Sequence, residues 1–481
     1  MNHTERRGGA AKVGLAAICA AWFKDVGLQG ESGGLAGILQ QDYASMVAFL
    51  KECFGAVVTP GVITTVAEAE QAAGEFRQAH VDAVVLVHIM WSEDQPLITL
   101  LEECKSFPLV LWHYHPSGHL PRHLTTDDLF RCSGTVGALQ GSAVLQKLGV
   151  TPLFASGTPG DSALRQALHQ LDQALAIRRD FQGMAAGRIA GMCAVMTGTR
   201  VDEQALRERL GVHLIEISAQ EYASACQAVT TERAQAYAAE IRARYVVDGV
   251  STASLALACR NTLALDDLVQ RYNLGVVAIQ DLDVELHRLV GIRPCLCPPE
   301  SARRGVAFGM ESDLHATLGL LAAMKAAEAP GMYTEVFTFD SRENLLLMGH
   351  AGVHDPRLAS DEGVTIVPDY EYRHSDEYEG AWQEFILAPG PVTCVSLYDT
   401  GHGYRLTAFE GESVAGPKKL QGFAHALVRP DIHVDLLLPG LLRLGLTQHF
   451  AVAPGRITDI LAKWCQVSEV EWVHLGEKGS R

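Results

Sequence analysis

The stretch "VDAVVLVHIMWSEDQPLITLLEECKSFPLVLWHY", residues 81–114, contains two continuous apolar runs with an amphipathic run between them. The runs at 81–89 and 108–114 are rich in β-branched and aromatic residues and predict strands, whereas 96–106 repeats its apolar residues at helical spacing. Strands that are apolar on both faces and joined by helices are typical of a parallel sheet covered on both sides. This stretch therefore predicts an α/β fold.

The same alternation continues in both directions along the chain. Toward the N-terminus it predicts strands at 13–20 and 56–63 and helices at 42–55 and 65–80. After a long helical stretch near 162–192, a second alternating region predicts strands at 190–196, 213–217 and 274–280 and a helix at 232–245.

From residue 363 onward, short extended segments split by Gly and Pro predict antiparallel β structure. The expected plan is two Rossmann-like α/β domains with parallel sheets, at 1–165 and 166–345, followed by a mostly antiparallel β domain at 346–481. The second of these domains would carry the two acidic site residues identified below.

Composition excludes several classes of partner. The chain has 481 residues, 48% of them hydrophobic, and its 56 acidic and 39 basic residues give a net charge of −17. Such a charge opposes binding to nucleic acids and to anionic membranes. No apolar run reaches the roughly 18 to 20 residues of a membrane span.

Cysteine usage and the N-terminus bear on the compartment. The eleven cysteines have irregular spacing without C-x-x-C pairs, which favours a reducing compartment. The segment "ERRGGAAKVGLAAICAAWF", residues 5–23, has features of an export signal, but Lys12 interrupts it and the α/β pattern requires an opening strand here. We therefore expect a cytoplasmic protein.

Two carboxylates and a histidine form the first candidate site. Glu311 is expected to open a helix, where an acid can also merely complement the helix dipole. Glu335 follows 24 residues later in an alternating strand, on the same face as Phe337 and Phe339, where an ionised acid is costly unless it is paired or bound to metal. His350 follows 15 residues after Glu335, between two glycines.

Histidines elsewhere in the chain give two more candidates. His449 precedes an apolar strand, and a lone histidine in that position is more often structural than a ligand. The segment "WHYHPSGHLPRH" holds four histidines just after a predicted strand, at the edge where open parallel sheets place ligands. Because it lacks a carboxylate and contains two prolines, a substrate-facing role for His115 is favoured over a metal site there.

Three segments, taken in order, resemble the active-site segments of the L-fucose isomerase and L-arabinose isomerase superfamily. They are "MESDLHATLGLLAAM" (310–324), "TEVFTFDSRENLLLMGHAG" (334–352) and "LTQHFAV" (446–452), and "RPCLCPPE" (293–300) also suits the family. The order, spacing and domain plan cover most of the chain, but the first domain resembles the family only weakly.

The resemblance implies a metal-dependent aldose–ketose isomerase acting on an unphosphorylated sugar through an ene-diol(ate). It implies that Glu311 and Glu335 are the acid/base pair and that both also bind the metal, with His449 as a third ligand. His350 would be either a fourth ligand or an imidazole that lines the sugar site. Mn²⁺ suits such carboxylate and imidazole donors, with Mg²⁺ or Co²⁺ as alternatives. The resemblance also implies a homo-oligomer, a hexamer, in which a neighbour's first domain completes each site.

Departures from the family leave the substrate open. Gln448 precedes His449 where many relatives have paired histidines, so a second imidazole contact is missing there. Gln448 and Gln140, which lies in "CSGTVGALQGS", are the substrate-binding candidates beside His115. Two other functions fit the same features: a sugar epimerase using the same metal site, or a non-catalytic sugar-binding protein.

Overall fold

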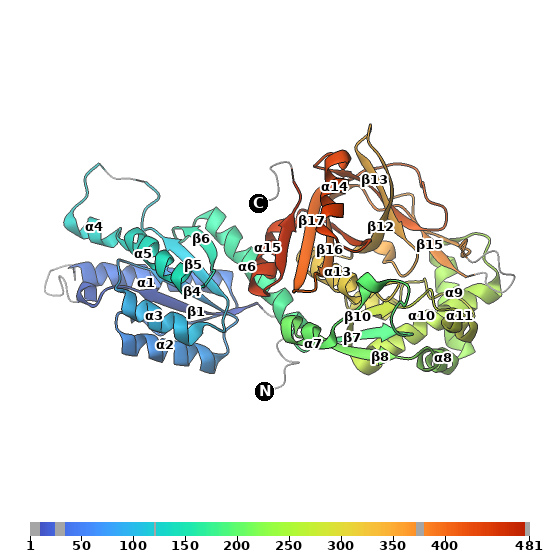
Figure 1. Cartoon of the computed structure of the whole chain (residues 1–481), viewed down its shortest axis with the longest axis horizontal. Helices are drawn as coiled ribbons and strands as arrows, with labels where there is room; N and C mark the ends of the chain where they lie inside the picture. Colours follow the sequence, from blue (N-terminus) through green and yellow to red (C-terminus); the bar gives the residue numbers. More distant parts are fainter. Residues whose placement is uncertain (1–9, 25–33, 120–121, 372–379, 477–481) are drawn as a thin grey trace. The chain divides into compact units, whose positions relative to one another are not determined.

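The structure is a computed structural model that describes residues 10–24, 34–119, 122–371 and 380–476. The chain divides into two compact units, Met1–Arg179 and Asp180–Arg481. The predicted fold class is confirmed, since two parallel sheets covered by helices precede an antiparallel sheet in the C-terminal part (Figure 1). The finer division into three domains, 1–165, 166–345 and 346–481, stays a prediction.

The first unit is built on a parallel sheet that includes both strands predicted from residues 81–114. In sheet order its strands are β2 (Ala56–Val58), β1 (Lys12–Ile18), β4 (Ala83–His88), β5 (Leu109–Tyr114) and β6 (Leu153–Gly157), and β3 (Val62–Ile63) also pairs with β1. Its helices are α1 (Gly34–Cys53), α2 (Val66–Ala79), α3 (Asp94–Cys104), α4 (Thr126–Arg131), α5 (Gly134–Lys147) and α6, which is Ser162–Phe181 and runs on to the second unit.

Helices cover both faces of this sheet. Leu111 belongs to a core that also contains apolar residues of α2, α3 and α5. The next residue, Trp112, is fully buried and lies 5.9 Å, between ring centroids, from Phe49 of α1. Because successive strand residues point to opposite faces, α1 packs on the face opposite α2 and α3. The continuous apolar strands of the sequence are explained by this two-sided burial.

The second unit begins with another parallel sheet, and here one predicted strand is wrong. The sheet order is β11 (Ala307–Gly309), β10 (Leu274–Ile279), β7 (Ala185–Ile189) and β8 (His213–Ile217). The strand expected at 190–196 is instead a loop after β7, because Ala190 and Gly191 have φ values of 64° and 78°, which turn the chain out of the extended conformation. Apolar composition alone misplaced this strand.

The helices around this sheet lie between residues 203 and 327. They are α7 (Glu203–Ala205), α8 (Ala219–Ala228), α9 (Thr231–Arg244), α10 (Thr252–Tyr272), α11 (Val284–Val290), α12 (Pro299–Arg303) and α13 (Leu314–Ala327).

The C-terminal antiparallel sheet closes on itself. Its order is β16 (Gly390–Asp399), β19 (His449–Pro454), β12 (Met332–Asp340), β13 (Leu345–His350), β18 (Ala424–Pro430) and β17 (Tyr404–Ser413), and β17 pairs again with β16. The last strand, β20 (Glu471–His474), adds to β17 in parallel. A small sheet contains β15 (Trp382–Glu384), β14 (Thr365–Val367) and β9 (Val246–Val247), and the remaining helices are α14 (Val434–Leu444) and α15 (Thr458–Val467).

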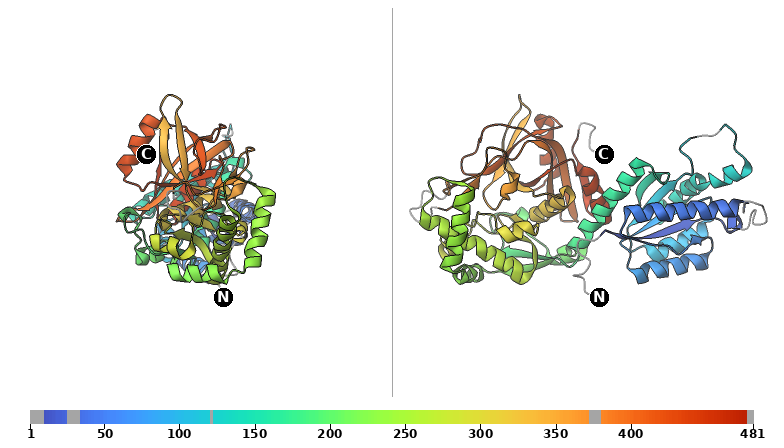
Figure 2. Two further views of the ribbon diagram at one scale, coloured as in Figure 1. Left: turned by 90° about the vertical axis from the view of Figure 1, so that its right-hand side faces the viewer. Right: turned by 180° about the vertical axis from the view of Figure 1, so that it is seen from behind.

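Helix α13 lies between the two large sheets of the second unit. It packs against β10 and β11 of the parallel sheet and against β16 and β19 of the antiparallel sheet (Figures 1 and 2). A helix enclosed in this way is buried on all sides, which explains why its sequence is apolar all round. The segment that enters α13 is therefore held at the junction of both sheets.

None of the helices in the described ranges combines the length and apolar character needed to cross a membrane.

Candidate metal and active site

Glu311 lies in the short segment between β11 and α13. The expectation that it opens the helix is wrong, because α13 begins at Leu314 and its N-cap is Asp313, whose side chain accepts a hydrogen bond from the Ala316 N–H at 3.0 Å. Glu311 and Ser312 both adopt the left-handed conformation, with φ of 57° and 56°. Non-glycine residues in this region cost about 1 to 3 kcal/mol each and persist only where the surroundings hold them.

Three hydrogen bonds hold this strained turn. The Glu311 N–H donates to Asp281 Oδ1 at 2.8 Å, and the Ser312 N–H donates to the Ile279 carbonyl at 3.0 Å. The Ser312 hydroxyl donates to the Gly191 carbonyl at 2.5 Å. These partners lie at the carboxyl ends of β10 and β7, the edge where parallel sheets place their ligands. The parallel sheet thus aims the Glu311 side chain.

Three neighbouring antiparallel strands position the other candidate residues. Strand β12 lies between β19 and β13, and its register places Glu335 opposite His449 on one side and opposite Gly349 on the other. His350 follows Gly349 directly. Residues that are far apart in the sequence are therefore neighbours across the sheet.

The apolar strand face predicted around Glu335 is wrong. The register of β12 against β13 shifts between Val336 and Thr338, which breaks the simple alternation. Phe337, at this irregularity, and Phe339, beyond it, are 42% and 49% exposed. The environment of Glu335 is set by the histidines and by Glu311 instead.

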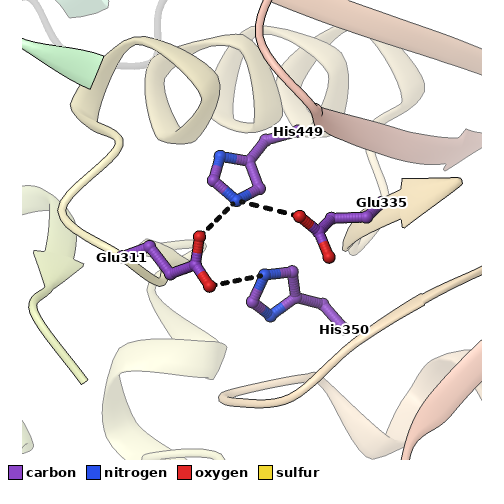
Figure 3. A group of neighbouring side chains, drawn as sticks. All are labelled: Glu311, Glu335, His350 and His449. Carbon is purple, nitrogen blue, oxygen red and sulfur yellow. Dashed lines mark hydrogen bonds and ion pairs between the residues drawn. The ribbon is translucent and has the colours of Figure 1, made fainter. Parts of the chain in front are cut away.

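The side chains of the four candidate ligands point toward one another and form a cluster (Figure 3). His449 Nε2 lies 3.2 Å from Glu311 Oε2 and 3.8 Å from Glu335 Oε1, and His350 Nε2 lies 4.0 Å from Glu311 Oε1. One ligand atom from each residue lies within 4.8 Å of all the others. Over the described ranges, this is the one group of His, Cys, Asp or Glu with geometry suited to a metal ion.

Burial and charge push the pKa values of these groups apart. Burial raises the pKa of Glu335 to about 7, although His449 opposes the shift. Burial would also raise the pKa of Glu311, but the hydrogen bond from His449 and the nearby His350 hold it below its ordinary value. Burial lowers the pKa of His350 to about 3, so its imidazole is neutral.

His449 has the opposite behaviour because it lies between carboxylates. Burial alone would lower its pKa, but hydrogen bonds to Asp313 and Glu311 raise the pKa to about 9. Its Nδ1 donates to Asp313 Oδ2 at 2.9 Å, and both side chains are fully buried. A carboxylate on the far nitrogen of a histidine orients the ring for metal binding through the near one.

The residues present fit a divalent cation. His350 Nε2 is buried and has no hydrogen-bond partner in the described part of the chain, whereas its Nδ1 is engaged with the Ala351 carbonyl at 2.6 Å. The free nitrogen therefore faces the carboxylates of the cluster. Two carboxylates with two imidazoles are a donor set typical of first-row transition metals.

A buried arginine, Arg293, binds acidic residues next to the cluster. Arg293 binds Asp369 through two nitrogens, at 2.9 and 3.1 Å, and lies 3.3 Å from Asp281 Oδ2. It also contacts Glu371 Oε2 at 2.5 Å and stacks over the Trp382 ring at 4.3 Å. Since the other oxygen of Asp281 accepts the Glu311 N–H, this ion-pair network reaches the main chain of the site.

The predicted substrate-binding residues Gln448 and Gln140 lie in different units of the chain. Gln448 is exposed, and its amide donates to Glu311 Oε2 at 3.4 Å and to Met196 Sδ at 3.2 Å. Gln140 lies in the first unit, where its amide accepts from Trp91 Nε1 at 2.9 Å and donates to Asp94 Oδ1 at 2.6 Å. Gln448 therefore contacts the cluster of Glu311, Glu335, His350 and His449, which lies in the same unit of the chain.

Two histidines of the segment "WHYHPSGHLPRH" contact neutral groups. His113 lies 3.0 Å from Ser156 Oγ and 3.1 Å from Thr135 Oγ1, and His115 lies 2.8 Å from the Ser117 carbonyl oxygen. Across the described residues, this segment has no group of metal-ligating atoms.

Three residues near the site were missed in the sequence. Asp313 carries a recognisable signal, because an Asp directly before an apolar helical run is a typical N-cap. Arg293 stands in the quoted "RPCLCPPE", but nothing local indicates that it binds three acids from distant segments. Tyr333, whose ring lies 4.9 Å from His449 and 5.2 Å from His350, reads in the sequence as an ordinary strand residue.

Comparison with known proteins points to one activity. No protein-family model matches the chain. Curated sulfoquinovose isomerases from Priestia aryabhattai and Priestia megaterium are each 21% identical over 431 residues, which is 87% of this chain and 91% of each relative. One from Alkalicoccus urumqiensis is 22% identical over 388 residues, 80% of either chain. Similarity to these enzymes over most of the chain indicates an aldose–ketose isomerase, an intramolecular oxidoreductase.

Proposed function

We propose that the chain is a divalent-metal-dependent isomerase that interconverts an unphosphorylated aldose and its ketose through an ene-diol(ate). The observation that carries the proposal is the convergence of Glu311, Glu335, His350 and His449, whose ligand atoms lie within 4.8 Å of one another. Binding a neutral sugar without turnover would not require such a set. Similarity to curated sugar isomerases supports the same class.

Without a bound cation, the pKa values of the two acids are shifted in opposite directions. Moving a carbonyl from C1 to C2 requires a proton to leave C2 and return at C1. The Glu311 carboxylate has a lowered pKa and stays ionised, which suits it to accept a proton. Glu335, with a pKa raised to about 7 by burial, holds or releases a proton near neutral pH. Pairs of acids with separated pKa values are typical of acid and base partners.

The same four residues would hold the cation. Glu311 and Glu335 would bind through carboxylate oxygens, and His350 and His449 through Nε2. When bound, a divalent cation supplies electrostatic stabilisation of the negative charge that develops on the sugar oxygens. Mn²⁺ is the first candidate, with Mg²⁺ and Co²⁺ as alternatives.

The finer points of the proposal follow the family resemblance. The resemblance to the L-fucose and L-arabinose isomerase superfamily implies a cytoplasmic hexamer in which Gln140 or His115 of a neighbour, together with Gln448, contacts the sugar. Sulfoquinovose, the sugar in the name of the curated relatives, is the first substrate to test. Pentoses, hexoses and 6-deoxyhexoses form the comparison set.

The test begins with protein stripped by chelator and reloaded with Mn²⁺, Mg²⁺ or Co²⁺. We expect no ketose formation from stripped protein and restored turnover with at least one cation. Replacing Glu311→Gln or Glu335→Gln should lower kcat by about 10²- to 10⁴-fold, the usual contribution of a general acid or base. Glu343→Gln, which alters an exposed acid in the turn after β12, should leave kcat unchanged.

Three outcomes would contradict the proposal. Turnover that persists without metal would show that the reaction does not require a cation. Formation of a C2 epimer as product would favour an epimerase. Tight sugar binding by metal-loaded protein without any product would favour a sugar-binding protein.

A further inference from the structure

A second pocket lies in the second unit and shares no residue with the four-residue cluster. It has a volume of about 260 Å³ and is lined from α9, from the segment leading into α12, from residues 355–357 and from β15. Helix α9 contributes four side chains that are three or four residues apart and so lie on one face of the helix: Tyr237, Glu240, Ile241 and Arg244. The proposed isomerase leaves this pocket without a role.

The walls are mostly apolar and aromatic. Ile241 and Leu296 belong to the buried core and form part of the lining, together with Pro299. Tyr237 and Tyr245 add two rings, and the Tyr237 hydroxyl is fixed by donating to the Cys297 carbonyl at 3.2 Å. A small, apolar pocket with aromatic walls favours a flat ring as its occupant.

A side-chain amide in the wall has a donor that is not used within the described part of the chain. Gln383 is only 4% exposed, and its Oε1 accepts the Cys297 N–H at 3.0 Å. Its amide nitrogen makes no hydrogen bond with any residue that the structure describes. The amide nitrogen of this pocket-lining residue can therefore donate to an acceptor atom of a ligand.

The charges of the pocket favour an anion. Three arginines and two acids line it, an excess of positive charge in a chain whose net charge is −17. Arg357 is bound to Asp355 at 2.9 Å and Arg303 to Glu300 at 2.7 Å. Arg244 has no hydrogen bond or ion pair to any residue in the described ranges. Its guanidinium is therefore available to a ligand, although Glu240 stands one turn before it.

We infer that this pocket is a second ligand site, which takes a planar aromatic compound carrying one anionic group and an acceptor atom. The rings would lie between Tyr237 and Tyr245, the anionic group would bind Arg244, and the acceptor would receive the Gln383 amide. This inference does not depend on the proposed isomerase activity.

The test uses 2-naphthoate as the probe and the full chain as the protein. Isothermal titration calorimetry should show one-to-one binding of 2-naphthoate. The neutral analogue 2-naphthalenemethanol should bind about tenfold more weakly, as expected when one charged hydrogen bond is lost. Arg244→Gln should remove this discrimination, and Ala302→Leu, which fills the pocket from α12, should weaken both compounds.

The matched control is Arg242→Gln. Arg242 is exposed, lies two residues from Arg244 and does not line the pocket, so its loss should leave binding unchanged. Circular dichroism melting would establish that each variant is folded. Absence of 2-naphthoate binding to the natural chain, equal binding of both compounds, or equal losses in Arg242→Gln and Arg244→Gln would overturn the inference.

Discussion

At the scale of single residues, Asp313 uses its two carboxylate oxygens for different tasks. Oδ1 caps α13, and Oδ2 accepts the Nδ1 hydrogen bond of His449. The second bond leaves His449 Nε2 to face Glu311 and Glu335. One side chain thus links the start of a helix to the orientation of a proposed metal ligand.

The two tasks can be separated by substitution. Asp313→Asn keeps a good N-cap but removes the charge beside His449, so Mn²⁺ affinity should fall about 10- to 100-fold while α13 stays formed. Asp313→Ala should lose the cap as well and cost about 1 kcal/mol more in unfolding free energy. Titration calorimetry and urea unfolding would measure the two effects. Unchanged affinity in both variants would show that Asp313 serves only the helix.

The protonation of Glu335 and His449 predicts how metal binding depends on pH. Without metal, Glu335 has a pKa raised to about 7 by burial, and His449 has a pKa of about 9 because Asp313 and Glu311 outweigh its burial. A cation must displace these protons, so its affinity should rise with pH. About two protons should be released per ion below pH 7 and about one between pH 7 and 9. Calorimetry in buffers of different ionisation enthalpy would count them, and affinity that falls as pH rises would contradict the assignment.

At the scale of elements, the ends of the parallel strands and the start of α13 depend on a buried charge network. Arg293 is 2% exposed and is shared by Asp281, Asp369 and Glu371. Burial raises the pKa of Asp281 to about 6 even though Arg293 opposes the shift. Removing the arginine would therefore leave buried carboxylates without a counter-charge next to the Glu311 turn.

Arg293→Met should destabilise the second unit by about 3 to 5 kcal/mol, as expected when one partner of a buried ion pair is lost. The matched control is Arg233→Met, which removes an arginine that pairs with Asp267 on the surface, at 2.7 Å and with both side chains more than a third exposed. Its cost should be at most about 1 kcal/mol. Urea unfolding of the two variants would compare them, and equal losses would show that the network contributes little.

At the scale of the whole molecule, the proposed ligands join two sheets of one unit. Glu311 follows β11 of the parallel sheet, whereas Glu335, His350 and His449 belong to the closed antiparallel sheet. A cation held by all four would tie the two sheets together. The described part of the first unit has no comparable group.

Metal should therefore stabilise the second unit and leave the first unchanged. A cation present at 100 times its Kd should contribute about 2.7 kcal/mol to the folded state of the unit that binds it. Differential scanning calorimetry with and without Mn²⁺ should show one transition moving to higher temperature. Glu335→Gln should remove most of that shift, and a shift that is the same in this variant would place the metal elsewhere.

Much of the fold could be predicted because the signal is local. Strands such as Ala83–His88 can be recognised in a short window of sequence, because burial on both faces gives a continuous apolar run. Helices such as Thr231–Arg244 can be recognised in the same way, because their apolar residues recur at helical spacing. The loop at 190–196 was misread because its apolar residues resemble a strand while two left-handed residues, Ala190 and Gly191, break it. Such backbone reversals have no hydrophobic signature.

By itself, the sequence determined the fold class and the residue types and order of the candidate site, because periodicity and side-chain chemistry are properties of the local chain. Only the tertiary structure decided that Glu335 faces His449 and that a left-handed turn aims Glu311 at both. It also decided that Asp313 and Arg293 support them. The physical reason is that strand register and buried ion pairs join residues far apart in the chain, and their free energy depends on the packing of the whole unit.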